Sequence, residues 1–225
     1  MAVRPYVVLS CAMSLDGYID DASPQRLILS NPADLDRVDE MRASVDAILV
    51  GAGTIRRDNP RLLVRSAERR AERIALGRPE SPIKVTLTRS GDLNPAADFF
   101  AAGSGEKIVY ALRPPTAEIG AVATVVVQPE LSIAGVFDDL AARGIKSVLV
   151  EGGSSVLTEC LGTAAFDELQ LVIAPFFVGD RRAPRFVGDG PFRFDAMHRL
   201  TLLDSTMVGD CALLTLTPPD PLEDR

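Results

Sequence analysis

The chain has 225 residues, 47% hydrophobic and 24% charged, which is ordinary for a globular protein and long enough for one large α/β domain. A formal net charge of −7 argues against general affinity for nucleic acid, which requires a clustered basic surface. One histidine and three widely spaced cysteines, with no C-x-x-C pair, argue against a metal site or a disulfide framework.

The N-terminal region predicts the start of a sheet. Residues 6–13 form an almost unbroken apolar run that ends at the tight-turn signal Asp16-Gly17, which is typical of a central strand and its exit. This region lacks the long apolar segment of a signal peptide, and no later run has the length needed to span a bilayer. We therefore expect a cytoplasmic protein without membrane contact.

A helix and a second strand follow. Residues 31–44 have helical spacing, with Asn31 as a cap and Pro32 in the first turn. Arg42 lies off the apolar stripe of this helix, so it is either a solvated side chain or a ligand contact. Residues 46–51 then predict a buried strand.

This strand runs into the sequence GAGTIRRDNPRLLVR. Gly51 and Gly53 match only the beginning of a dinucleotide-binding fingerprint, because its final glycine is missing, and G-x-G alone is a weak signal. Thr54 adds a hydroxyl group, and Asp58 begins a turn before a proline, either as an Asx turn or as a ligand contact. Together these residues are candidates for holding a cofactor.

The next segment predicts a polar helix or loop, followed by a third strand. Residues 66–81 are rich in arginine and glutamate and indicate a solvated helix or loop. Residues 83–88 alternate as a strand that ends in Thr88, Arg89 and Ser90. Two hydroxyls and a guanidinium, where NAD-binding proteins place an acid for the ribose hydroxyls, would suit a 2′-phosphate and favour NADP. A plain polar turn is the alternative.

The remaining pattern predicts one α/β domain over residues 1–225. Strands are expected at 107–112, 124–127, 147–151, within 166–178 and at 207–217, and a helix at 132–143 capped by Ser132. Alternating strands and helices, then consecutive strands, indicate a mostly parallel mixed sheet flanked by helices with an antiparallel C-terminal edge. We expect His198 at the surface, without a partner carboxylate, and a flexible tail after about residue 218.

The stretch from Val148 to Leu161 is organised as an anion-binding turn. An apolar strand stops at Glu151, turns through Gly152 and Gly153, and restarts as a helix that Ser154 or Ser155 can cap. A phosphate would bind well at such a helix N-terminus, although an ordinary strand-to-helix turn is the alternative. Glu151 favours the first interpretation, since a carboxylate there points into the crevice where open α/β sheets bind ligands.

Four segments carry a resemblance to a known family: LSCAMSLDG, DAILVGAGTIRRDNPRLLVR, VLVEGGSSVLTECL and FDELQLVIAPFFVGD. In this order they resemble the reductase domain of bacterial riboflavin biosynthesis, whose fold is that of dihydrofolate reductase. The deaminase signature of bifunctional members is missing, so we expect a stand-alone reductase. The resemblance implies a homodimer that uses NADPH to reduce 5-amino-6-(5-phosphoribosylamino)uracil, or its diamino relative, by hydride transfer to the ribose C1′.

The resemblance also implies roles for individual residues. Arg42, Leu62, Arg65 and Glu151 correspond to substrate contacts, the arginines suiting a phosphate and Glu151 the pyrimidine. Glu151 is also the best ionisable candidate for proton delivery. Ala12, Thr54 and Asp58 correspond to cofactor contacts, and a cis peptide is expected between Gly152 and Gly153. The pyrophosphate would be wrapped by Gly153, Ser154, Ser155, Val156, Leu157 and Thr158.

Two positions depart from the family pattern. Bifunctional members usually carry a lysine where this chain has Ser10, and an aromatic or small polar residue where it reads Leu27-Ile28-Leu29. Loss of the lysine removes a cation that could contact the substrate. Two alternatives therefore stay open: a reductase of dihydrofolate or another heterocycle, and a nucleotide-binding paralogue without efficient catalysis.

Overall fold

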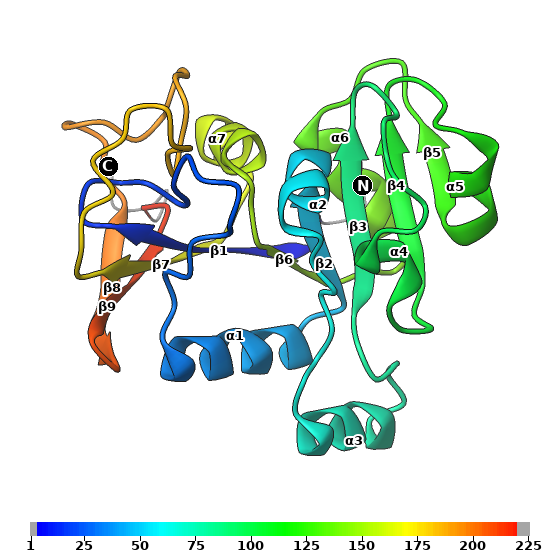
Figure 1. The fold of residues 1–225 in the computed structure, drawn as a ribbon, viewed down its shortest axis with the longest axis horizontal. Helices are drawn as coiled ribbons and strands as arrows, with labels where there is room; N and C mark the ends of the chain where they lie inside the picture. Colours follow the sequence, from blue (N-terminus) through cyan, green and yellow to red (C-terminus); the bar gives the residue numbers. More distant parts are fainter. Residues whose placement is uncertain (1–3, 220–225) are drawn as a thin grey trace.

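The fold is built on one sheet of nine strands in the order β5-β4-β3-β2-β6-β1-β7-β9-β8 (Figure 1). The structure is a computed structural model and describes residues 4–219. The strands are β1 (Tyr6–Ser14), β2 (Ala47–Gly51), β3 (Ile83–Thr88), β4 (Lys107–Ala111), β5 (Thr124–Val127), β6 (Ser147–Val150), β7 (Glu168–Ala174), β8 (Thr201–Val208) and β9 (Cys211–Thr217). The helices are α1 (Pro32–Ser44), α2 (Ala52–Asp58), α3 (Ala67–Ala75), α4 (Asp98–Ala101), α5 (Ala117–Val122), α6 (Ile133–Ala142) and α7 (Ser154–Thr163).

The sheet is parallel from β5 to β7 and antiparallel beyond it. β1 pairs in parallel with β6 and β7, whereas β9 pairs antiparallel with both β7 and β8. The predicted mostly parallel sheet with an antiparallel C-terminal edge is therefore confirmed. The register aligns Leu9 of β1 with Val150 of β6, and Val150 with Leu49 of β2, so β2 and β6 end beside the middle of β1, whose carboxyl half extends beyond them.

Apolar residues on both faces of the central strands make the core. On β2, Leu49 belongs to a buried cluster with Phe137 of α6 and Leu157 of α7. Its neighbour Ile48 belongs to a second cluster with Ile55 of α2 and residues of α4 and α5. Successive strand residues point to opposite faces, so β2 is covered on both sides and reads as a continuous apolar run.

Helix caps bear out some sequence signals and correct others. Asn31 caps α1 by accepting from the Asp34 N–H at 2.9 Å, and Ser132 caps α6 by accepting from the Gly135 N–H at 3.2 Å. The prediction that Ser154 or Ser155 caps α7 is wrong, because Gly153 is the N-cap and Ser154 donates to the Arg185 carbonyl instead.

The predicted last strand, residues 207–217, is two strands. The chain reverses at Gly209, whose φ of 62° suits glycine, and forms the hairpin of β8 and β9. The sequence pattern did not predict β8, because this strand is the exposed edge of the sheet. Helix α2 was also missed, since a helix of seven residues is too short for clear periodicity.

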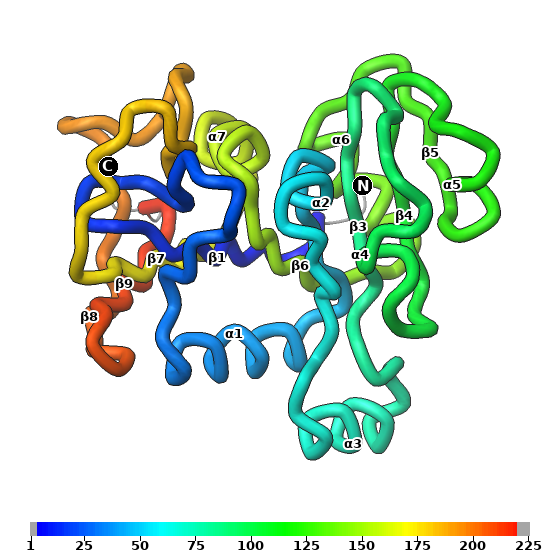
Figure 2. Tube along the Cα trace, in the orientation of Figure 1, coloured from blue at the N-terminus to red at the C-terminus, as the bar shows by residue number. Residues whose placement is uncertain are grey.

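The structure also describes the polar segment and most of the C-terminal region, for which the sequence made predictions. α3 lies at the end of two extended connections, below the sheet in Figure 2, in agreement with the predicted solvated helix. His198 is exposed as expected, but Asp195 is its carboxylate partner, with 3.2 Å between Nδ1 and Oδ1. The predicted flexible tail falls mainly on residues 220–225, which lie outside the described residues.

Candidate active site

The two glycine-containing bends lie against each other at the carboxyl edge of the sheet. The Gly51 N–H donates to the Gly152 carbonyl at 2.9 Å, and the Glu151 N–H donates to the Leu49 carbonyl at 3.1 Å. The Gly152–Gly153 peptide is cis, as the resemblance implied. A Cβ on Gly153 would lie 3.0 Å from Thr54 Oγ1, so α2 packs closely on the second bend and any side chain there would have to displace the Thr54 hydroxyl.

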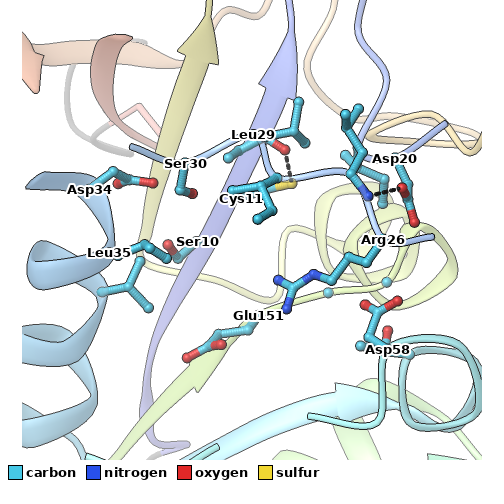
Figure 3. Close-up of a pocket in the computed structure, with 18 of the residues that line it drawn as sticks. Ser10, Cys11, Asp20, Arg26, Leu29, Ser30, Asp34, Leu35, Asp58 and Glu151 are labelled. Atoms are coloured by element: carbon cyan, nitrogen blue, oxygen red, sulfur yellow. Dashed lines mark hydrogen bonds between the residues drawn. The ribbon is translucent and has the colours of Figure 1, made fainter. Parts of the chain in front are cut away.

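A first cavity of about 410 Å³ opens beside these bends (Figure 3). Its walls come from the carboxyl half of β1, the loop of residues 19–30, α1, α2 and the second bend. The sequence-predicted site residues that line it are Ala12, Arg42, Thr54, Asp58, Arg65, Glu151, Gly152 and Gly153. Leu27, Ile28 and Leu29, the segment that departs from the family pattern, line it as well.

A second cavity of about 360 Å³ continues the first. Both are lined by Asp20, Thr54, Asp58 and Gly153, so they form one continuous groove. The predicted residues on its wall are Gly51, Gly53, Thr54, Asp58, Gly153, Ser154, Ser155 and Val156. Because no described side chain caps α7, the first N–H groups of this helix are available to an anion in the second cavity.

Other predicted site residues line neither cavity in the described part of the chain: Leu62, Thr88, Arg89, Ser90, Leu157 and Thr158. Leu62 and Leu157 are core side chains, 2% and 0% exposed. Thr88 Oγ1 accepts from the Gly91 N–H, which closes the turn after β3, while Arg89 and Ser90 are exposed beside it. Thr158 is occupied by hydrogen bonds with Ser154 and Gly188. The resemblance of the sequence to the family did not distinguish these residues from the ones that line the groove.

Arg42 and Glu151 form a forked ion pair in the first cavity. Arg42 Nε lies 2.7 Å from Oε1 of Glu151 and Nη2 lies 2.6 Å from Oε2, and the side chains are only 16% and 13% exposed. Burial alone would lower the pKa of Arg42, but the attraction and hydrogen bonding of Glu151 raise it above the ordinary value. Glu151 therefore holds the guanidinium in place, and its outward lone pairs remain available to a ligand N–H.

Asp58 has a different environment, at the junction of the two cavities. Its Oδ1 is buried and has no hydrogen-bond partner within residues 4–219. Burial raises the pKa of Asp58, the charges of Arg26 and Arg57 oppose this, and Asp20 adds to it. Figure 3 shows Asp58 across the cavity from Asp34 and close to Arg26. A carboxyl group whose pKa is raised by burial can retain a proton more readily than a solvated one.

Arg65 lies at the rim of the first cavity and is held by α1. Its backbone N–H donates to Asp39 at 2.5 Å, and its guanidinium contacts Asp39 and the Leu35 carbonyl. Asp39 is only 2% exposed and also accepts from the Ser66 N–H at 3.0 Å. The side chain of Arg65 is half exposed, so a buried carboxylate positions a cation that an anionic ligand can reach.

Several groove residues were not predicted from the sequence. Asp20 pairs with Arg57 of α2 at 2.8 Å and accepts from the Leu27 N–H at 2.9 Å, which pins the loop of residues 19–30 over the cavity. Asp34 and Arg37 line the cavity from α1. An acid in the first turn is usual in any helix, so only the long unpatterned loop before α1 could have signalled a site here.

Two kinds of feature are absent from the part of the chain that the structure describes. Across residues 4–219, none of the helices has both the length and the apolar character required to cross a membrane. Within the same residues, no group of three or more His, Cys, Asp or Glu side chains gathers into a metal-binding arrangement.

Comparison with known proteins agrees with this geometry. Residues 5–214 match the family described as the RibD C-terminal domain. The chain is 34% identical over 191 residues to 2,5-diamino-6-ribosylamino-4(3H)-pyrimidinone 5′-phosphate reductase of Archaeoglobus fulgidus, covering 81% of this chain and 85% of that protein.

Solved structures of related proteins have a similar fold. RibD of Acinetobacter baumannii superposes with a TM-score of 0.80 at 25% identity, and the match covers 96% of this chain but only 59% of that one. Dihydrofolate reductase of Enterococcus faecalis, complexed with NADP(H) and an inhibitor named RAB-propyl, superposes with a TM-score of 0.51 at 15% identity, covering 98% of this chain and 100% of that one. This last likeness concerns the fold alone, and it confirms the predicted dihydrofolate-reductase-like class.

Proposed function

The chain belongs to the RibD C-terminal domain family, and from this premise we propose that it is an NADPH-dependent reductase of a phosphoribosylaminopyrimidine in riboflavin biosynthesis. The relative in Archaeoglobus fulgidus is named as a reductase of such a compound. The observation that carries the proposal is the continuous groove, which joins Arg42 and Arg65 at one end to the uncapped N-terminus of α7 at the other. Such a groove suits a phosphorylated substrate beside a dinucleotide.

The second cavity supports binding of the dinucleotide. The pyrophosphate would lie at the N-terminus of α7, where Gly153 leaves the backbone N–H groups open, with the Thr54 hydroxyl alongside. Ala12 of β1 lines the adjoining cavity and leaves space for a flat ring. When bound, a reduced nicotinamide would supply the hydride for C1′ of the opened ribose.

The preference for NADPH rests on the end of β3. Arg89 and Ser90 are exposed there and follow the strand that neighbours β2. An adenosine ribose that extends from the second cavity toward this edge would bring its 2′-phosphate to a guanidinium. This contact would lie beyond the groove, since Arg89 lines neither cavity.

Different roles are proposed for the two groove carboxyls. Glu151 would orient the pyrimidine and hold Arg42, since both its oxygens accept from that guanidinium. Asp58 would serve as the proton reservoir in place of Glu151, because burial raises its pKa and one of its oxygens has no partner in the described chain. The proton would go to the ring oxygen or imine nitrogen as the C1′ centre accepts the hydride.

We also propose a cytoplasmic homodimer. β8 is an edge strand on which Leu202, Leu203 and Met207 are exposed, and such an apolar edge suits a second copy of the chain. Cys11, Cys160 and Cys211 are all free thiols, which suits a reducing compartment.

One assay tests the proposed function against its alternatives. The purified chain is given NADPH or NADH with the phosphoribosylaminopyrimidine or with dihydrofolate, and loss of reduced nicotinamide is followed by absorbance. We expect oxidation of NADPH with the phosphorylated pyrimidine. Turnover of dihydrofolate alone would support a pterin reductase, and no turnover with either compound would support the nucleotide-binding paralogue.

A further inference from the structure

Asp34 is a carboxylate that the fold buries without satisfying. It is 1% exposed and lies in the first turn of α1, yet it lines the first cavity. Its Oδ1 accepts from Nε and Nη2 of Arg37, at 2.8 and 2.7 Å. Its Oδ2 is buried and has no hydrogen-bond partner among residues 4–219. Burying an acceptor without a partner is costly, so a donor from a ligand would stabilise this oxygen.

The cavity can supply that donor, because no described side chain makes a hydrogen bond to Oδ2. Arg37 is already engaged by Oδ1 and also contacts Gln170 and Met41. Burial and the charge of Asp34 raise the pKa of Cys11 to about 12, so this thiol stays neutral. Figure 3 shows Asp34 at one end of the cavity, beside Ser30 and near Ser10.

The face of α1 has the spacing to hold a flat ring. Asp34, Val38 and Arg42 all line the cavity and recur every fourth residue, so they share one helix face over about 12 Å. The apolar surface of Val38 therefore lies between an acceptor at one end and the Arg42–Glu151 pair at the other. A pyrimidine placed over Val38 would direct one polar edge toward Asp34.

We infer that Asp34 is a specificity-determining residue that accepts a hydrogen bond from an exocyclic amino group at C2 of the pyrimidine. This rests on the proposed function and deepens it, because the two candidate substrates differ at this atom. The diaminopyrimidinone has an N–H donor at C2, which matches Oδ2. The uracil has a carbonyl there, whose lone pairs face the carboxylate oxygen without a proton between them. The enzyme thus acts on the diamino compound, before deamination.

The test compares kcat/KM for the two phosphoribosylated substrates at saturating NADPH. The wild-type chain should favour the diamino compound by about tenfold or more, as expected for a hydrogen bond to a charged group. Asp34→Asn should lower this ratio toward one, mainly through KM, because an amide can present either a donor or an acceptor. Glu40→Gln, an exposed change on the same helix, is the matched control and should leave the ratio unchanged.

The outcomes separate the inference from the function on which it rests. Equal use of both substrates by the wild-type chain would overturn the role of Asp34 while the reductase activity stands, and this measurement needs no variant to fold. An unchanged ratio in a folded Asp34→Asn protein would overturn it as well, because a purely structural effect lowers both rates together. If neither substrate supports NADPH oxidation, the proposed function itself fails, and the inference fails with it.

Discussion

Replacing Arg42 with alanine would leave the carboxyl group of Glu151 without its guanidinium partner in the first cavity. The two side chains are 16% and 13% exposed and share bonds of 2.7 and 2.6 Å, so solvent can compensate only a small part of the loss. Removal of one partner from a buried pair costs about 3–5 kcal/mol. Since some exposure remains, we expect about 3 kcal/mol for Arg42→Ala, which lowers Tm by about 6–12 °C in a chain of this length.

A double-mutant cycle separates this structural cost from the role in the substrate site. The free energy of unfolding is measured in urea for Arg42→Met, Glu151→Leu and the double variant, without substrate. The double variant should recover most of the stability, because two apolar side chains replace a pair that was costly to desolvate. It should remain inactive, since both groups are proposed to contact the substrate. Additive losses of stability, or a loss below about 1 kcal/mol for Arg42→Ala, would refute the reasoning.

The other predictions concern the proton, the phosphate and the cofactor. Burial raises the pKa of Asp58, so its contribution to stability is present below the unfolded pKa and is lost as pH rises through the folded value. Asp58→Asn should therefore flatten the dependence of unfolding free energy on pH in that window, and should remove the decline of kcat as pH rises through the pKa of Asp58; unchanged profiles would exclude it as the proton source. Arg65→Ala should raise KM about tenfold to a hundredfold for the phosphorylated substrate but not for its dephosphorylated analogue, and equal losses for both would contradict phosphate binding. Arg89→Ala should reduce the ratio of kcat/KM for NADPH over NADH by about tenfold, and a constant ratio would place the 2′-phosphate elsewhere.

The environment of Asp34 could not be predicted from the residues near it in the sequence. In the sequence it is an ordinary acid in the first turn of a helix whose cap, Asn31, was recognised. Its significance comes from Arg37, which takes one oxygen, and from the folded surroundings, which bury the other without a partner in the described chain. Leu157 shows the converse, because it lies in the first turns of α7 after the glycine bend but is buried in the core. The burial of Asp34 and of Leu157 depends on residues that are distant in the sequence.

The sequence by itself determined the features that depend on near neighbours. β3 and β5 begin and end at the residues that the sequence predicted, and the motif at residues 148–161 located the second glycine bend. The tertiary structure alone decided which of these features meet. The hydrogen bond from Gly51 to Gly152 joins bends about a hundred residues apart, and Arg42 reaches Glu151 across the same distance in sequence. Burial, ion pairing and the shift in the pKa of Asp58 arise from such long-range contacts, because a side chain takes its solvation and charge from whatever the fold packs beside it.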